Sequence, residues 1–290
     1  MKKGNFKIYS SYEHYLPGAS GVIILLVWFI VGALLGNVFS LLLGLTGMGM
    51  DAILPVSYVV MFIPPMLYSA TKSRSIAPVA SGRKLDSSNF KPVGGIKCAG
   101  IVIVGTLALG VIADGLTALL PEMPETLKTL LESMTGGNFW INFLCVSIFA
   151  PFFEEWLCRG MILRGLLGRG SKPWVAIVIS ALVFAVIHAN PWQAVPAFLL
   201  GAFFGYVYYK TGSLKLTMLM HFTNNTFALI CGHTDSLKDV ETMMDLFGRA
   251  YPYALAASIL IVLLSILTFK KIELNSKSGN MDEVKPLFSE

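Results

Sequence analysis

Long apolar runs alternate with short polar segments along most of the chain. A helix needs roughly 20 predominantly apolar residues to cross a bilayer, and eight runs approach or exceed that length. They predict eight transmembrane helices, at residues 21–45, 52–68, 95–120, 140–163, 173–190, 193–209, 214–231 and 251–269. Only a tight Pro191-Trp192 turn separates the fifth run from the sixth, so seven helices is the alternative count.

Composition agrees with this pattern. Of the 290 residues, 55% are hydrophobic and 13% are charged, and the mean hydropathy is +0.68. Soluble domains carry about 25% charged residues, so this chain has too few polar groups to cover a folded surface in water. The four cysteines lie in or beside apolar runs without CxxC spacing, which favours packing roles over disulfides or a zinc knuckle. The predicted fold class is an all-α, polytopic transmembrane helical bundle.

The basic residues predict the orientation of the bundle. A cytoplasmic N-terminus places all but three of the 22 Lys and Arg residues on the cytoplasmic side, including those of residues 159–172. The exceptions are Lys128, Lys238 and Arg249, in loops that are otherwise acidic. Cytoplasmic loops are enriched in Lys and Arg, so both termini are predicted to be cytoplasmic. The net charge of +5 then reflects topology and contact with anionic lipid, not binding of nucleic acid.

Ionisable residues inside a bilayer are costly and tend to mark function. The fourth run contains Glu154, Glu155 and Arg159. Glu155 and Arg159 have i,i+4 spacing and share one helix face, which predicts an ion pair. Glu154 lies about 100° around the helix, lacks that partner and is a candidate general base. The alternative is an ordinary set of surface charges at a cytoplasmic helix end.

Two further runs carry polar groups. His188 is the only ionisable residue of the fifth run, and His221 and Asn225 share one face of the seventh, whereas Asn224 faces elsewhere. Taken singly, these residues also suit packing or interhelical hydrogen bonds. Together with Glu154 they provide a base that activates water and donors for an oxyanion. They also provide the two histidines and one carboxylate of a catalytic zinc site. The sequence contains no HExxH motif and no serine or cysteine nucleophile motif.

Three motifs in this order, on separate predicted helices, make the chain similar to the CPBP intramembrane proteases. That family comprises type II CAAX prenyl proteases and bacteriocin-processing enzymes. The resemblance spans roughly residues 140–231, about a third of the chain, and is carried by Glu154-Glu155-x-x-x-Arg159, Phe184-x-x-x-His188 and His221-x-x-x-Asn225.

The resemblance implies two residues that activate water, two that hold the oxyanion and three that shape the site: Glu154 with His188, His221 with Asn225, and Glu155, Arg159 and Phe184. The family has been described both as metalloproteases and as glutamate-dependent proteases. The amide beside His221 and the single free carboxylate favour the reading without a cofactor, with zinc as the alternative.

The predicted organisation has three parts. Residues 1–138 form three helices with a basic cytoplasmic loop, residues 139–232 form a four-helix catalytic core, and residues 233–290 form the last helix and a polar tail. The predicted function is an intramembrane endopeptidase of the bacterial plasma membrane, acting on a membrane-associated peptide or protein. A prenylated C-terminal peptide, a bacteriocin leader and a pheromone precursor are all compatible substrates.

Two other functions stay open at the level of sequence. One is a catalytically silent scaffold or immunity protein. The other is a proton-coupled transporter, with Asp114 of the third run in a relay with Glu154 and His188. The alternative role for Asp114 is a hydrogen bond to a neighbouring helix near the outer end of the bundle. The Gly32/Gly36 and Gly201/Gly205 pairs have the small-xxx-small spacing of close helix packing.

Overall fold

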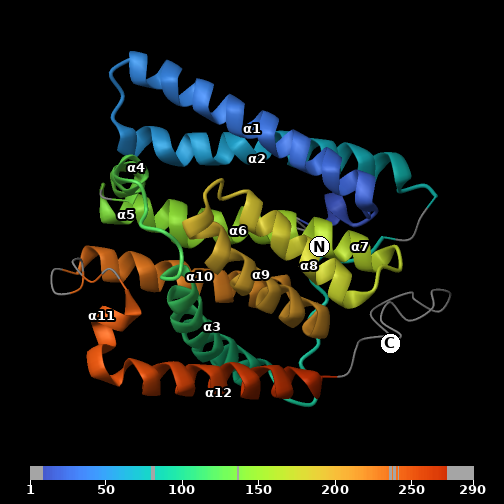
Figure 1. Cartoon of the computed structure of the whole chain (residues 1–290). Helices are drawn as coiled ribbons and strands as arrows, with labels where there is room; N and C mark the ends of the chain where they lie inside the picture. The colour runs from blue at the N-terminus through green and yellow to red at the C-terminus, as the bar shows by residue number, and fades with distance from the viewer. Residues whose placement is uncertain are drawn as a thin grey trace, which may run out of the picture.

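The computed structural model describes residues 9–79, 82–135, 137–234, 237, 240 and 242–272, and this part of the chain is helical, without strands (Figure 1). The predicted N-terminal tail up to residue 8 and the polar tail from residue 273 lie outside it. Eight long helices occupy the predicted positions: α1 (Ala19–Leu45), α2 (Met50–Ile76), α3 (Gly95–Thr117), the helix Phe139–Gly168, α8 (Pro173–Val186), α9 (Pro191–Thr211), α10 (Leu214–His233) and α12 (Tyr251–Lys270). Two shorter helices, α4 (Glu125–Thr135) and α11 (Met243–Phe247), lie in the connections.

Five helical segments of the described chain are long and apolar enough to cross a membrane: α1, α2, α3, the helix Phe139–Gly168 and the segment Met243–Lys270. The protein is therefore a multi-pass membrane protein. The 14-residue helix α8 rises about 21 Å, less than the roughly 30 Å of the hydrocarbon core.

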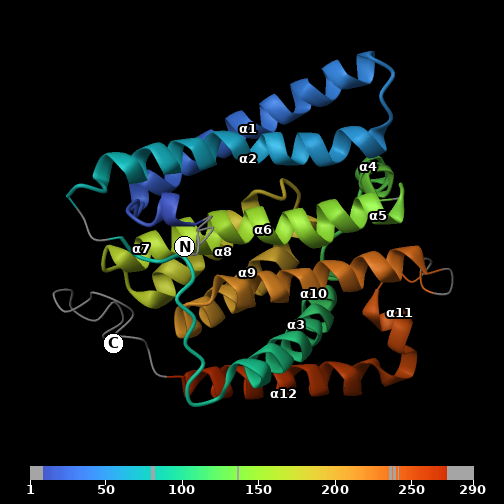
Figure 2. The ribbon, with the colours of Figure 1, turned by 180° about the vertical axis from the view of Figure 1, so that it is seen from behind.

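The helices form three layers, as the two opposite views in Figures 1 and 2 show. The hairpin of α1 and α2 makes one outer layer, and α3 with α12 makes the other. The helix Phe139–Gly168 and helices α8, α9 and α10 lie between them. The segment that carries the three sequence motifs is thus flanked on both sides by the other helices.

The loops predicted to be cytoplasmic meet at one end of the bundle. The Arg83 amide donates to the Glu13 carbonyl at 2.9 Å, and the Asn89 amide donates to the Thr211 carbonyl at 2.8 Å. These two hydrogen bonds join three segments that lie far apart in the sequence, around residues 13, 83–89 and 211.

The loops predicted to be external meet at the opposite end. The indole Nε1 of Trp192 donates to the Pro121 carbonyl at 2.8 Å, and the Met243 amide donates to Asp114 Oδ2 at 2.8 Å. This grouping of loops is what an alternating path through a membrane requires. Which end faces the cytoplasm stays a prediction.

Two of the basic residues counted as topology determinants are in fact buried. Arg159 is completely buried, and Arg164 is only 6% exposed. A guanidinium carries five N–H donors and no acceptor, so a buried arginine needs several oxygen partners. Arg164 finds them on backbone carbonyls that the N-terminal segment, the loop before α3 and its own helix bring together: those of Tyr12, Glu13, Tyr15, Arg83 and Gly160.

Local sequence signals set the helix ends near the motifs. Asn190 caps α9 by accepting a hydrogen bond from the Gln193 amide at 2.9 Å, and Pro191 begins the helix. Gly212, with φ of 63°, ends α9 in the left-handed conformation, and Ser213 caps α10. The fifth predicted helix was expected to run to residue 190, but α8 ends at Val186. The reason is that Ala189 has a φ of 58°, outside the helical region, and Asn190, which precedes Pro191, is extended as the cap of α9.

Candidate active site

The helix that carries both glutamates changes its winding on either side of them. It consists of α5 (Phe139–Asn142), a π-helical stretch (Phe143–Phe149), α6 (Ala150–Glu155), a second π-helical stretch (Trp156–Leu163) and α7 (Arg164–Gly168). Pro151 has no amide hydrogen and would crowd the preceding turn of a regular α-helix, and the wider turn ahead of it accommodates the ring. Local π-helical turns occur frequently at functional sites. Glu154 and Glu155 occupy the short α-helical segment between the two stretches.

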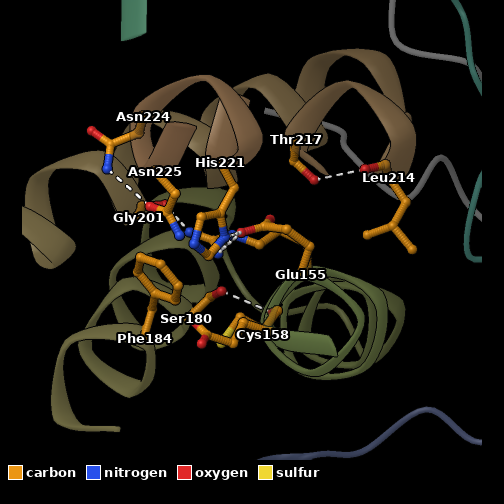
Figure 3. Close-up of polar contacts among 12 residues, drawn as sticks. Glu155, Cys158, Ser180, Phe184, Gly201, Leu214, Thr217, His221, Asn224 and Asn225 are labelled. Atoms are coloured by element: carbon orange, nitrogen blue, oxygen red, sulfur yellow. Dashed lines mark hydrogen bonds and ion pairs between the residues drawn. The ribbon is translucent and has the colours of Figure 1, made fainter. Parts of the chain in front are cut away.

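Glu155 forms the centre of a buried charged network. Its Oε1 lies 2.7 Å from Nη1 of Arg159, so the predicted ion pair is present, and both side chains are fully buried. The same oxygen lies 3.1 Å from Nδ1 of His221, which comes from α10 (Figure 3). An ionised carboxylate only accepts hydrogen bonds, so Nδ1 of His221 carries the hydrogen. This contact fixes the imidazole and leaves Nε2 as its second polar atom.

Arg159 also binds outside this pair. Its Nη2 donates to the carbonyl of Gly201 in α9 at 2.8 Å. Its Cζ lies 4.6 Å from the ring centre of Phe184 and 5.3 Å from that of Phe204. A Cβ at Gly201 would approach Phe184 and Arg159 at 3.1 and 3.2 Å. Gly201 therefore packs closely, as its spacing predicted, and it also supplies an acceptor to the site.

Glu154 has a separate environment. It does not pair with Arg159, in agreement with its predicted position on another face. Its Oε1 accepts a hydrogen bond of 2.6 Å from the hydroxyl of Tyr58 in α2. Its Oε2 is buried and has no hydrogen-bond partner among the described residues. Buried polar atoms are nearly always paired, so this oxygen is a candidate for binding water or substrate.

His188 lies just past the end of α8, in a turn rather than in the predicted helix. Its Nδ1 lies 2.7 Å from the Phe184 carbonyl, which only accepts hydrogen bonds, so Nδ1 carries the hydrogen, and Nε2 presents a lone pair in the neutral form of the ring. The Phe184 ring packs edge-to-face against both imidazoles, with centroid distances of 5.2 Å to His188 and 5.3 Å to His221. The predicted shaping residue Phe184 thus lies between the two histidines.

Asn225 is held by two hydrogen bonds. Its Nδ2 donates to the Val146 carbonyl in the first π-helical stretch at 2.9 Å. Its Oδ1 accepts a hydrogen bond of 3.1 Å from Nδ2 of Asn224. Asn224 points away from His221, as predicted (Figure 3), but it orients the Asn225 amide, a role that helical spacing alone did not indicate. No direct hydrogen bond joins Glu154 to His188, or His221 to Asn225, in the part of the chain that the structure describes.

Comparison with known proteins bears on this site directly. Residues 136–227 match the model of a protein family described as type II CAAX prenyl endopeptidase, Rce1-like. The match contains all three motifs and the network around Glu155. This segment is thus similar to that family over about a third of the chain.

Two other comparisons add less. The chain is 28% identical to an uncharacterized 24.3 kDa protein of Escherichia coli over 148 residues, which are 48% of this chain and 68% of that protein. No solved structure matches the chain. The CAAX endopeptidase match is thus the comparison that carries functional information, and it shows that the segment is similar to a protease family.

The zinc alternative requires three donors that lie close to one another. Metal-binding histidines usually donate their other ring N–H to a carboxylate or carbonyl, and His188 and His221 are oriented in this way. However, no group of three or more His, Cys, Asp and Glu side chains within the described residues lies close enough together to hold a metal ion. The zinc alternative, with Glu154 and both histidines as ligands, is therefore left to experiment.

Tyr58 lies outside the segment that matches the CAAX endopeptidase family, and the sequence pattern did not single it out. It is one tyrosine among ten, in a helix identified only as apolar. Asp114, by contrast, forms a hydrogen bond to a neighbouring segment, which was the predicted alternative to a relay. It accepts this bond from the Met243 amide at 2.8 Å. This contact accounts for Asp114 without a proton relay.

Proposed function

We propose that the protein is an intramembrane endopeptidase that hydrolyses a peptide bond in a membrane-associated peptide or protein, with water activated by Glu154. The observation that carries the proposal is the Glu154 carboxylate. One of its oxygens is hydrogen-bonded and the other is buried without a partner among the described residues. A carboxylate in this state has an oxygen available to accept a proton from water.

In the proposed reaction, Glu154 Oε2 takes a proton from water while the water oxygen attacks the carbonyl carbon of the substrate. His188 assists through Nε2, whose lone pair is an acceptor. The proton then passes to the leaving amine when the C–N bond breaks. General-base assistance of this kind is typically worth about 10²–10⁴-fold in rate.

The proposed oxyanion donors are His221 and Asn225. With Nδ1–H directed at Glu155, His221 donates from Nε2 in its imidazolium form, and the Glu155 carboxylate stabilises that charge. The Asn225 amide has two N–H groups, of which one binds Val146 and the other is available to the oxyanion. Such donors are worth more where water is excluded, and the flanking layers of helices favour that exclusion.

The extent of the catalytic core, the membrane and the topology are proposed as the sequence predicts them. The catalytic core is residues 139–232, the membrane is the bacterial plasma membrane, and both termini face the cytoplasm. The substrate class is a peptide at the membrane surface, with a prenylated C-terminal peptide first among the candidates because the matching family is described as CAAX prenyl endopeptidases. A bacteriocin leader and a pheromone precursor are the alternatives.

The test compares the wild type with Glu154→Gln and Asp114→Asn. Membrane peptides from cells carrying each form are compared by mass spectrometry, and the purified proteins are assayed in nanodiscs with a farnesylated, internally quenched CAAX peptide. We expect Glu154→Gln to lose nearly all cleavage and Asp114→Asn, which alters a half-buried carboxylate outside the three motifs, to keep it. A fully active Glu154→Gln would contradict the proposal.

The same preparation tests the metal question. We expect activity to survive thorough chelation and the purified protein to carry no stoichiometric zinc. Reversible loss of cleavage on removal of one zinc per chain would instead make Glu154, His188 and His221 ligands.

A further inference from the structure

Tyr58 lies in a part of α2 that packs closely against α1. Its helix α2 is locked to α1 at two glycines: a Cβ on Gly32 would collide with the Met61 carbonyl oxygen, and a Cβ on Gly36 would lie 3.0 Å from the Ser57 carbonyl oxygen. Ser57 and Met61 flank Tyr58 in α2. The close approach of the two backbones therefore holds the stretch of α2 that carries Tyr58.

Aromatic packing then directs Tyr58 towards the helix Phe139–Gly168. The Tyr58 ring lies 5.7 Å from Phe62 in α2 and 6.4 Å from Phe153, the residue before Glu154. Phe62 stacks on Phe153 with a centroid distance of 5.0 Å. These rings fix α2 against the helix Phe139–Gly168 beside the carboxylate, so the Tyr58 hydroxyl reaches Glu154 across a packed interface.

The hydrogen bond itself distinguishes the two carboxylate oxygens. Its length of 2.6 Å is that of a charge-assisted O–H···O⁻ bond. Because the hydroxyl holds Oε1, the carboxylate cannot rotate freely, and Oε2 is the oxygen left without a partner among the described residues. The tyrosine thus determines which oxygen is available and where it points.

We propose that Tyr58 is a positioning residue for Glu154, supplied by α2 from outside the family-matched segment. The inference rests on the proposed function, since it acts through the general base of that reaction. It assigns a role in the site to the hairpin of α1 and α2, which packs against the helix Phe139–Gly168. The segment 136–227 is incomplete as a catalytic site without this hydroxyl.

The test removes the hydroxyl alone. Tyr58→Phe keeps the ring and its contacts with Phe62 and Phe153. The matched control is Tyr206→Phe, which deletes another tyrosine hydroxyl in the bundle, one that donates to the Ile266 carbonyl at 3.2 Å. With the farnesylated CAAX peptide in nanodiscs, we expect Tyr58→Phe to lower kcat about 10- to 100-fold, the range for a hydrogen bond to a charged group. KM is expected to stay close to the wild type, kcat is taken per folded protein because the lost bond also stabilises the fold, and the control is expected to keep its kcat.

A second measurement needs no substrate. Infrared spectra of protein with ¹³C-labelled glutamate are compared for Tyr58→Phe, Tyr206→Phe and each in a Glu154→Gln background. We expect Tyr58→Phe to shift a carboxylate band, and the shift to vanish when Glu154 is replaced. An unchanged carboxylate spectrum, or an unchanged kcat with the band shifted, would overturn the positioning role. Full activity of Glu154→Gln with the band shift present would overturn the proposed function and leave the contact established.

Discussion

Two adjacent glutamates of one helix bind different partners in this protein. Glu154 and Glu155 are neighbours in sequence, yet one binds a tyrosine from α2 and the other binds Arg159 and His221. The difference arises because adjacent residues of a helix point about 100° apart, towards different neighbouring helices. Glu155 is neutralised by a cation, which suits a structural anion, whereas the one partner of Glu154 among the described residues is a neutral hydroxyl, which suits a base.

The two asparagines of α10 allow a test of the oxyanion site at the level of single residues. Asn225→Ala removes a proposed donor, and loss of one such donor costs about 10²–10³-fold in turnover. Asn224→Ala removes only the hydrogen bond that orients Asn225, so we expect a smaller loss. Turnover of the CAAX peptide per folded protein checks both values. A larger loss for Asn224→Ala than for Asn225→Ala would contradict the assignment.

At the scale of helices, Arg159 is the principal polar connection in the middle layer. It binds Glu155 in its own helix and Gly201 in α9, and its guanidinium lies over Phe184 of α8. Through Glu155 it also supports His221 of α10. Four helices therefore depend on one buried cation, which gives it a structural role beside its place in the motif.

Removing this cation is expected to destabilise the fold. Breaking a buried ion pair by removing one partner typically costs about 3–5 kcal/mol, so Arg159→Ala should lower the yield of folded protein together with activity. The control is Lys215→Ala, which breaks the exposed pair with Asp86, 3.5 Å apart, in which Lys215 is 78% exposed. An exposed pair is worth about 0–1 kcal/mol. Thermal unfolding in detergent checks both variants, and a stable but inactive Arg159→Ala would place Arg159 in the reaction itself.

At the scale of the whole molecule, the loops separate into two groups at opposite ends of the bundle. One group contains the junction of residues 83 and 89 with residues 13 and 211, and the other contains the contact between Asp114 and Met243. The basic loops belong to the first group. The positive-inside rule therefore predicts that this end faces the cytoplasm.

Cysteine labelling tests that orientation. Lys271 is exposed just after α12, and Met244 is 52% exposed in α11 before it. Single substitutions to cysteine, made with Cys231→Ser because the other three cysteines are buried, are treated with an impermeant maleimide on intact cells. We expect Met244→Cys to react and Lys271→Cys to react only after lysis. Reaction of both on intact cells would contradict the topology.

The sequence by itself determined the class of the molecule, the positions of its helices and its motif residues. Hydrophobic run length and charge distribution depend only on local composition, and the pairing of Glu155 with Arg159 depends only on i,i+4 geometry within one helix. The end of α8 was missed because apolar residues continue past Val186, while the Asn190-Pro191 cap stops the helix.

Only the tertiary structure decided which side chains meet between helices. Tyr58 and Glu154 are 96 residues apart, and nothing in the local pattern of α2 distinguishes Tyr58 from other aromatic residues. Arg159 and Arg164 were counted among the basic residues of the cytoplasmic side. Their burial also depends on the helices and loops that pack around them. These contacts depend on how helices pack, because a side chain's partner across an interface is set by the relative position of two backbones and not by the sequence of either one.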